Sequence, residues 1–78
     1  MAHFAVMYAT TGQGDITRMV ILEVVQQFPG LSMQEIAAQG RLSYEQVRRQ
    51  APQLTSQGLI YPKREGRKKF YYAGTAIV

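Results

Sequence analysis

The chain has 78 residues, a formal net charge of +4 and no cysteine. This length predicts one domain with a modest core, and the lack of cysteine excludes disulfides, thiolate metal ligation and thiol catalysis. The N-terminus lacks the basic flank and the long apolar run of a signal peptide, so we expect a cytoplasmic protein.

The first 14 residues are predicted to form an N-terminal arm, separate from a domain over residues 15–78. Phe4, Val6 and Tyr8 alternate with smaller apolar residues, which is compatible with a short strand over His3–Ala9. The composition of residues 10–14 indicates a loop, and Asp15 is a good N-cap for a helix that follows it.

The first helix is predicted to run from Asp15 to the Pro29–Gly30 stop signal. Its apolar side chains recur at helical spacing, which favours a stripe facing the core. The stripe consists of Ile16, Met19, Val20, Val24 and Phe28, widened by Ile21, Leu22 and Val25.

Two further helices begin with the same kind of start signal, eleven residues apart. Ser32 with Glu35, and Ser43 with Gln46, have the spacing of a capping box, in which two side chains satisfy two orphan backbone N–H groups. Gly40 lies between them and suits the left-handed residue that ends a helix. A short helix, a tight turn and another helix are helix-turn-helix geometry.

The third helix is predicted to turn one apolar side inward and one polar side outward. At about 100° per residue, Val47, Ala51 and Leu54 fall on the inner side. The outer side carries Glu45, Arg49, Gln53 and Ser56. Because an interior proline removes a helical hydrogen bond and crowds the preceding turn, we expect a kink or break near Gln50–Pro52.

Residues 58–74 form two apolar runs around a basic tip, which is typical of a β-hairpin. The tip carries 5 basic residues and 1 acidic residue, a charge of 5 − 1 = +4 that equals the formal net charge of the whole chain. The basic residues are Lys63, Arg64, Arg67, Lys68 and Lys69, and the acidic residue is Glu65. Such a concentration of charge predicts a polyanionic partner.

The hairpin turn is predicted at Glu65–Gly66 as a two-residue loop, with a type I turn and glycine bulge as the alternative. Pro62 cannot donate a backbone hydrogen bond, so its strand is expected at the edge of the sheet. The two-residue loop places four apolar side chains on one face: Leu59, Tyr61, Phe70 and Tyr72.

From about Ile16 to Tyr72 the chain resembles bacterial winged helix-turn-helix regulators, especially the ArsR-type and MarR-type repressors. The resemblance rests on Ser43-x-x-x-Val47, Leu54, Gly58-Leu59-Ile60 and Arg64-Glu65-Gly66-Arg67 followed by Phe70-Tyr71-Tyr72. It implies an α+β fold of three helices with a C-terminal β-hairpin wing. It also implies a bacterial or phage transcriptional regulator that binds double-stranded DNA sequence-specifically, with the third helix in the major groove and the wing on the backbone or minor groove.

The candidate DNA-binding residues are Ser43, Tyr44, Gln46, Arg48 and Arg49 on the third helix and Lys63, Arg64, Arg67, Lys68 and Lys69 in the hairpin. Arginine suits guanine edges and glutamine suits adenine edges. The alternative for the helix is a solvated face with a Glu45–Arg49 pair. The alternative for the hairpin is an edge strand that charge protects from aggregation.

The sequence lacks the residue patterns of catalytic and metal-binding sites. No acid–base pair or positioned nucleophile is found, so we expect no enzyme. The lone His3 has no clustered ligands, so we expect no metal and no cofactor. Two further functions stay open: a winged-helix module that binds protein, and a binder of RNA or unusual duplexes. A homodimer is expected, with residues 1–14 and the first helix as candidate contacts.

Overall fold

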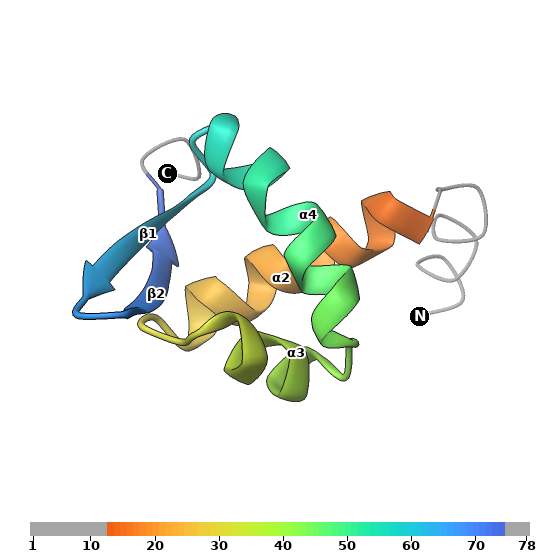
Figure 1. Cartoon of the computed structure of the whole chain (residues 1–78). Helices are drawn as coiled ribbons and strands as arrows, with labels where there is room; N and C mark the ends of the chain where they lie inside the picture. Colours follow the sequence, from red (N-terminus) through yellow and green to blue (C-terminus); the bar gives the residue numbers. More distant parts are fainter. Residues whose placement is uncertain (1–12, 75–78) are drawn as a thin grey trace.

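The computed structural model describes residues 13–74, and in them three helices precede an antiparallel hairpin. The elements are α2 (Gln13–Gln27), α3 (Met33–Gly40), α4 (Tyr44–Ser56), β1 (Ile60–Glu65) and β2 (Lys68–Ala73). The hairpin lies at the end of the molecule away from the start of α2 (Figure 1). The predicted winged helix-turn-helix architecture is confirmed, whereas the predicted strand over His3–Ala9 lies outside the described residues.

Helix α2 begins earlier than its sequence predicts. It starts at Gln13, so the predicted loop through Gly14 and the N-cap at Asp15 are wrong. Asp15 instead lies in the first turn, where a carboxylate favours the helix dipole, and it forms an ion pair with Arg18. Arg18 also donates to Gln50 at 2.7 Å and to Gln53 at 2.9 Å. These bonds to α4 support the first turn of α2 despite the low helix propensity of glycine.

Both predicted capping boxes are confirmed. The Ser32 Oγ accepts from the Glu35 backbone N–H at 3.2 Å, and a Glu35 carboxylate oxygen accepts from the Ser32 N–H at 2.9 Å. Ser43 and Gln46 make the same reciprocal pair at 3.1 and 2.9 Å. Each helix of the helix-turn-helix motif therefore starts at the residue that its local sequence predicts.

The end of α3 differs from the prediction. The left-handed residue is Arg41, with φ of 56°, and not Gly40, which is the last helical residue. A Cβ atom at position 40 would lie 2.8 Å from the Val20 Cγ1 atom. Gly40 is therefore required by the close approach of α3 to α2. The left-handed conformation that ends the helix is adopted by the next residue, Arg41.

Of the kink or break predicted near Gln50–Pro52, the break is wrong, because α4 continues through Pro52 to Ser56, and the kink stays a prediction. Pro52 and Arg48, whose carbonyl loses its helical donor, are both exposed, so water can satisfy that carbonyl. The inner side of the helix is as predicted, with Val47, Ala51 and Leu54 at 0 to 1% exposure.

The core lies between the three helices and one face of the hairpin. Its largest side chains include Ile21, Ile36, Leu54 and Ile60, and Tyr71 joins them at 3% exposure. Burial raises the pKa of the Tyr71 hydroxyl, with a smaller contribution from Tyr44. The predicted stripe on α2 is displaced by part of a turn, since Met19 and Phe28 remain 39% and 42% exposed.

In the hairpin, Glu65 pairs with Lys68, so the two-residue loop is Gly66–Arg67 and lies one residue later than predicted. Gly66 has φ of 64°, which suits the first central position of a type II′ turn. Tyr61, Phe70 and Tyr72 still share a face, because the pairing has moved by two residues. Leu59, the fourth member of the predicted set, precedes β1 and packs against the core.

Strand β1 is an edge of the sheet, as the proline predicts. Pro62 lies opposite Tyr71. The Tyr71 N–H donates to the Leu31 carbonyl, and the Tyr71 carbonyl accepts from the Gly30 N–H. Both backbone groups of Tyr71 therefore point away from β1. A residue without an N–H is therefore tolerated opposite Tyr71.

Between residues 13 and 74, no helix has the length and apolar character that crossing a membrane requires.

Candidate nucleic-acid interface

The first component of the site is the cationic half of the hairpin. Lys63, Arg64, Arg67, Lys68 and Lys69 are all exposed. The ion pairs found among the described residues involve only Arg18 and Arg48, so none of these five cations is paired with a carboxylate. The hairpin therefore projects a positive charge that is not neutralised locally.

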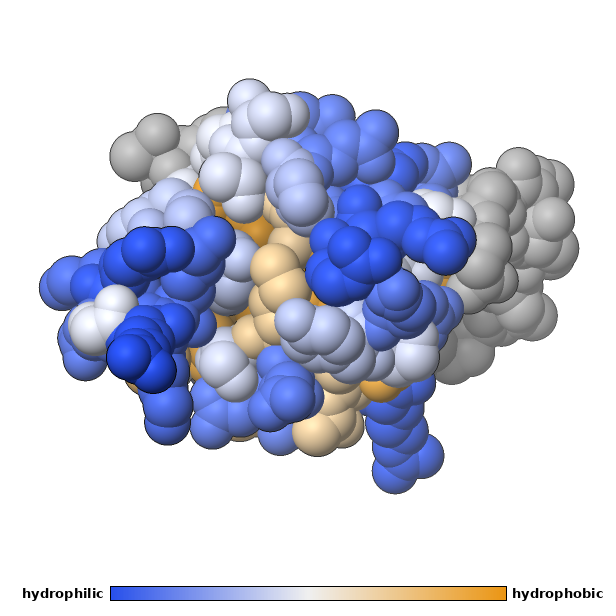
Figure 2. Space-filling view, viewed as in Figure 1, coloured by the Kyte–Doolittle hydropathy of each residue, from blue (hydrophilic) through white to orange (hydrophobic). Residues whose placement is uncertain are grey.

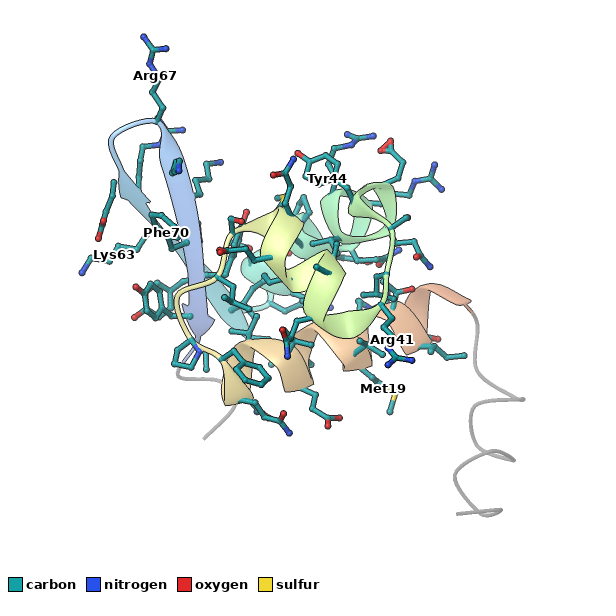
Figure 3. All side chains as sticks on the ribbon, turned by 90° about the horizontal axis from the view of Figure 1, so that it is seen from below. Met19, Arg41, Tyr44, Lys63, Arg67 and Phe70 are labelled. Atoms are coloured by element: carbon teal, nitrogen blue, oxygen red, sulfur yellow. The ribbon has the colours of Figure 1, made fainter. Side chains whose placement is uncertain are left out.

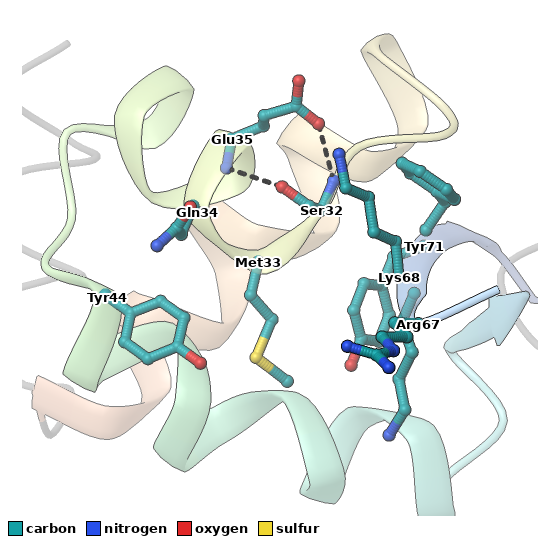
Figure 4. Close-up of a pocket in the computed structure, with 10 residues that line it drawn as sticks. Ser32, Met33, Gln34, Glu35, Tyr44, Arg67, Lys68 and Tyr71 are labelled. Carbon is teal, nitrogen blue, oxygen red and sulfur yellow. Dashed lines mark hydrogen bonds between the residues drawn. The ribbon is translucent and has the colours of Figure 1, made fainter. Parts of the chain in front are cut away.

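A groove separates this hairpin from the start of α3 and α4 and has a volume of about 550 Å³. One wall carries Arg67, Lys68 and Lys69, and the other carries Tyr44 and the first turn of α3. Met33 extends into the groove between Tyr44 on one side and Tyr71 with Arg67 and Lys68 on the other (Figure 4). The groove thus has a partly apolar floor and a cationic wall.

The hairpin and α4 present their polar groups on a common side. Tyr44 and Arg67 point to one side of the molecule, whereas Met19 and Arg41 point to the opposite side (Figure 3). Figure 2 shows two strongly hydrophilic areas, over the hairpin and over α4, with a less polar strip between them. A long polyanion could contact both areas at once.

On α4, Arg48 is bound within its own helix. Its Nε and Nη2 atoms donate to the two Glu45 carboxylate oxygens at 2.8 and 2.7 Å. This hydrogen bonding lowers the pKa of Glu45 and raises the pKa of Arg48. The Glu45–Arg49 pair considered from the sequence is wrong, since Glu45 binds the residue before Arg49.

The other predicted residues of α4 differ in how free their polar atoms are. Arg49 is exposed and, among the described residues, makes no ion pair. Tyr44 is 48% exposed. Ser43 and Gln46 use their side-chain oxygens in the capping box, which leaves the Gln46 amide nitrogen and the Ser43 hydroxyl hydrogen as free donors.

The sequence did not identify the part that α3 contributes to the groove. Ser32, Met33 and Gln34 line it because the Leu31–Tyr71 bridge brings the start of α3 against β2. The capping box located the helix start, but no local signal places that start beside the hairpin. Arg18 was missed as well, although Asp15 at i−3 was a signal for an ion pair.

No group of three or more His, Cys, Asp or Glu residues within the described part of the chain could hold a metal ion.

A sequence model of the family described as "Replication protein A C terminal" matches residues 4–63. The match ends inside β1, so it includes all three helices and only the first half of the hairpin. No curated protein sequence matches the chain.

Several solved structures share the fold. A predicted DNA-binding transcriptional regulator from E. coli is 22% identical with a TM-score of 0.72, over 97% of this chain and 78% of that one. Another is the homodimeric winged helix-turn-helix DNA-binding domain of Mb0332 from Mycobacterium bovis, a possible ArsR-family transcriptional regulator. It is 23% identical with a TM-score of 0.70, over 99% of this chain and 72% of that one. The transcriptional regulator SlyA is 21% identical with a TM-score of 0.67, over 88% of this chain. The match spans only 49% of SlyA. At these identities the comparisons establish a winged helix-turn-helix fold.

Proposed function

The chain belongs to the family described as "Replication protein A C terminal", and with this premise and the charge of the hairpin we propose that it binds double-stranded DNA as a regulator. In this proposal α4 enters the major groove and reads sequence, and the hairpin follows the backbone or the minor groove. The family name refers to a replication protein, and the similar structures are named as transcriptional regulators. Two of the similar structures are named as DNA-binding, which supports DNA as the partner.

The observation that carries the proposal is the unpaired charge of the hairpin. Five exposed cations with no carboxylate partner among the described residues would repel one another in the absence of a counter-charge. Phosphate groups supply that counter-charge, and release of their condensed counterions favours binding. Arg67 and Lys68 also line the groove opposite Tyr44, so a phosphate backbone lying there would touch both elements.

We further propose that the working form is a homodimer that uses residues 1–14 and the outer surface of α2. Met19 and Phe28 are partly exposed apolar side chains of that region. Met19 points away from the side occupied by Tyr44 and Arg67, so a dimer formed there would leave both DNA-contacting elements free (Figure 3). Two copies would present two recognition helices, as a two-fold symmetric site requires.

The test is the salt dependence of duplex binding. Replacing Arg64, Arg67 and Lys68 together by alanine should flatten the slope of log K against log salt by about 2 to 3 units, since each phosphate contact contributes about 0.9. Fluorescence anisotropy with a labelled duplex measures this slope.

The matched control is Arg41→Ala, which removes an exposed arginine on the opposite side of the molecule (Figure 3). It should leave the slope unchanged. If the folded triple variant has the wild-type slope, the hairpin does not bind phosphate.

A second candidate function, a module that binds protein, is favoured by one observation. Arg48 is bound by Glu45, and the Gln46 side-chain oxygen is used in the capping box, which leaves Arg49 as the least constrained base reader on α4. Absence of any duplex binding at low salt would favour this candidate, because a DNA-binding protein should show at least non-specific affinity there.

A further inference from the structure

Three aromatic side chains lie on the hairpin face that is turned away from the core: Tyr61, Phe70 and Tyr72. We refer to them as the outer aromatic face. The strand register pairs Tyr61 with Tyr72, and cross-strand partners share a face. The other face supplies Ile60 and Tyr71 to the core. The solvated face of an antiparallel hairpin is normally polar, so these aromatic side chains need an explanation.

Packing within the hairpin explains part of the aromatic character of this face. The Tyr61 and Tyr72 rings stack with their centroids 5.6 Å apart and an angle of 25° between their planes. Such a cross-strand pair stabilises a hairpin. Tyr61 nevertheless remains 49% exposed, so the stack leaves aromatic surface open to solvent.

Positive charge adjoins this surface. Lys63 is paired with Phe70 in the register, and Lys68 lies two residues before Phe70 and opposite Glu65. The same face therefore carries two lysines and one carboxylate, an excess of positive charge. Lys63 extends from the hairpin on the side away from the helices (Figure 3). Exposed aromatic rings beside cations are the combination that binds single-stranded nucleic acid, because the rings stack on bases and the cations contact phosphates.

We propose that the outer aromatic face binds an unpaired stretch of nucleic acid, with bases stacked on the tyrosine pair and phosphates near Lys63 and Lys68. A second copy of the chain is a less suitable occupant. A symmetric contact through this face would bring its lysines close to their own copies, and like charges across an interface are unfavourable.

This site adjoins the duplex-binding surface proposed above, because Phe70 and Lys68 also line the groove, but its tyrosine pair lies outside that surface. Tyr61 and Tyr72 are not among the residues that line the groove beside α3 and α4. A chain with both surfaces would favour a duplex that continues into a single strand. Lys68 belongs to both surfaces, whereas Tyr61 and Tyr72 belong only to the outer aromatic face. Substitutions at Tyr61 therefore test this proposal alone, and either proposal can fail while the other stands.

The test compares Tyr61→Leu with Tyr61→Phe, which keeps the aromatic ring and removes only the hydroxyl. With a labelled oligothymidylate at low salt, Tyr61→Leu should weaken binding about 5- to 150-fold, the equivalent of one lost base stack, and Tyr61→Phe should bind like the wild type. Neither substitution should change the affinity for a blunt duplex. Equal oligothymidylate affinity for folded Tyr61→Leu and wild type would overturn the proposal.

A second measurement does not depend on how well Tyr61→Leu folds. The chain has no tryptophan, so Tyr61→Trp introduces a single reporter at this face. Its emission should be quenched by oligothymidylate and unaffected by blunt duplex. No quenching at saturation, or a change in sedimentation that shows Tyr61→Leu has lost a dimer contact, would reject the single-strand assignment.

Discussion

At the scale of single residues, neighbouring arginines on α4 differ in what holds them. Arg48 is fixed by two charge-assisted hydrogen bonds to Glu45, whereas Arg49 is exposed and forms no ion pair with the described residues. An arginine that must break its hydrogen bonds to a carboxylate before it binds a base loses part of the binding free energy that the base contact supplies. We therefore expect Arg49 to contribute more to recognition.

Arg49→Ala should cost about 1 to 3 kcal/mol of binding free energy at a preferred duplex and less on random DNA, as expected for a bidentate base contact. Arg48→Ala should cost less than Arg49→Ala at the same duplex. Selection of bound sequences from random duplexes gives the site, and anisotropy titrations give the affinities. An equal loss for Arg49→Ala on both duplexes would assign Arg49 to phosphate.

At the scale of elements, the fit between α2 and α3 depends on the missing side chain of Gly40. Alanine is the better helix former by about 1 kcal/mol, so local propensity alone predicts that Gly40→Ala is stabilising. The new Cβ would, however, lie 2.8 Å from the Val20 Cγ1 atom and 3.4 Å from the Val24 Cγ2 atom. Val20 is β-branched and has little rotamer freedom in a helix with which to move away.

Gly40→Ala should therefore destabilise the fold by about 1 kcal/mol, as overpacking of a close contact does. In a Val20→Ala background the same substitution should be neutral or stabilising, because the Val20 methyl group at 2.8 Å is gone and the remaining neighbours lie at 3.4 Å or more. Urea unfolding of the four proteins in this double-mutant cycle measures the coupling. Additive effects of the two substitutions would show that the contact is not the cause.

At the scale of the whole molecule, the two polar contact regions lie on one side, and partly exposed apolar side chains of α2 lie elsewhere. Tyr44 and Arg67 point one way, and Met19 points the other (Figure 3). A chain this small buries a limited apolar area by itself. Association through α2 and residues 1–14 would add buried area without covering the groove.

Sedimentation equilibrium should find a dimer for the full chain and a monomer for a truncated chain that begins at Gln13. Met19→Lys in the full chain should weaken the dimer, because the charge would be buried in the contact. Gln34→Lys, an exposed position that lines the groove, is the control for added charge. A full chain that stays monomeric at tens of micromolar, alone and with duplex, would contradict the dimer.

Local sequence determined several parts of this protein. The two capping boxes predicted the starts of α3 and α4, since the bonds that define them join residues only three positions apart. Pro62 predicted an edge strand because a proline cannot donate to a ladder on both sides. The hairpin and its charge also followed directly from residues that are close in sequence.

Tertiary structure decided the features that depend on distant residues. Arg18 joins α2 to side chains of α4, and Val20 fills the space beside Gly40, so position 40 must be a glycine. The groove exists because the Leu31–Tyr71 bridge brings α3 against β2. The choice of Ile60 and Tyr71 for the core left Tyr61 exposed and Phe70 and Tyr72 partly exposed on the outer aromatic face. Periodicity assigns side chains to faces, but only packing between elements determines which face is buried.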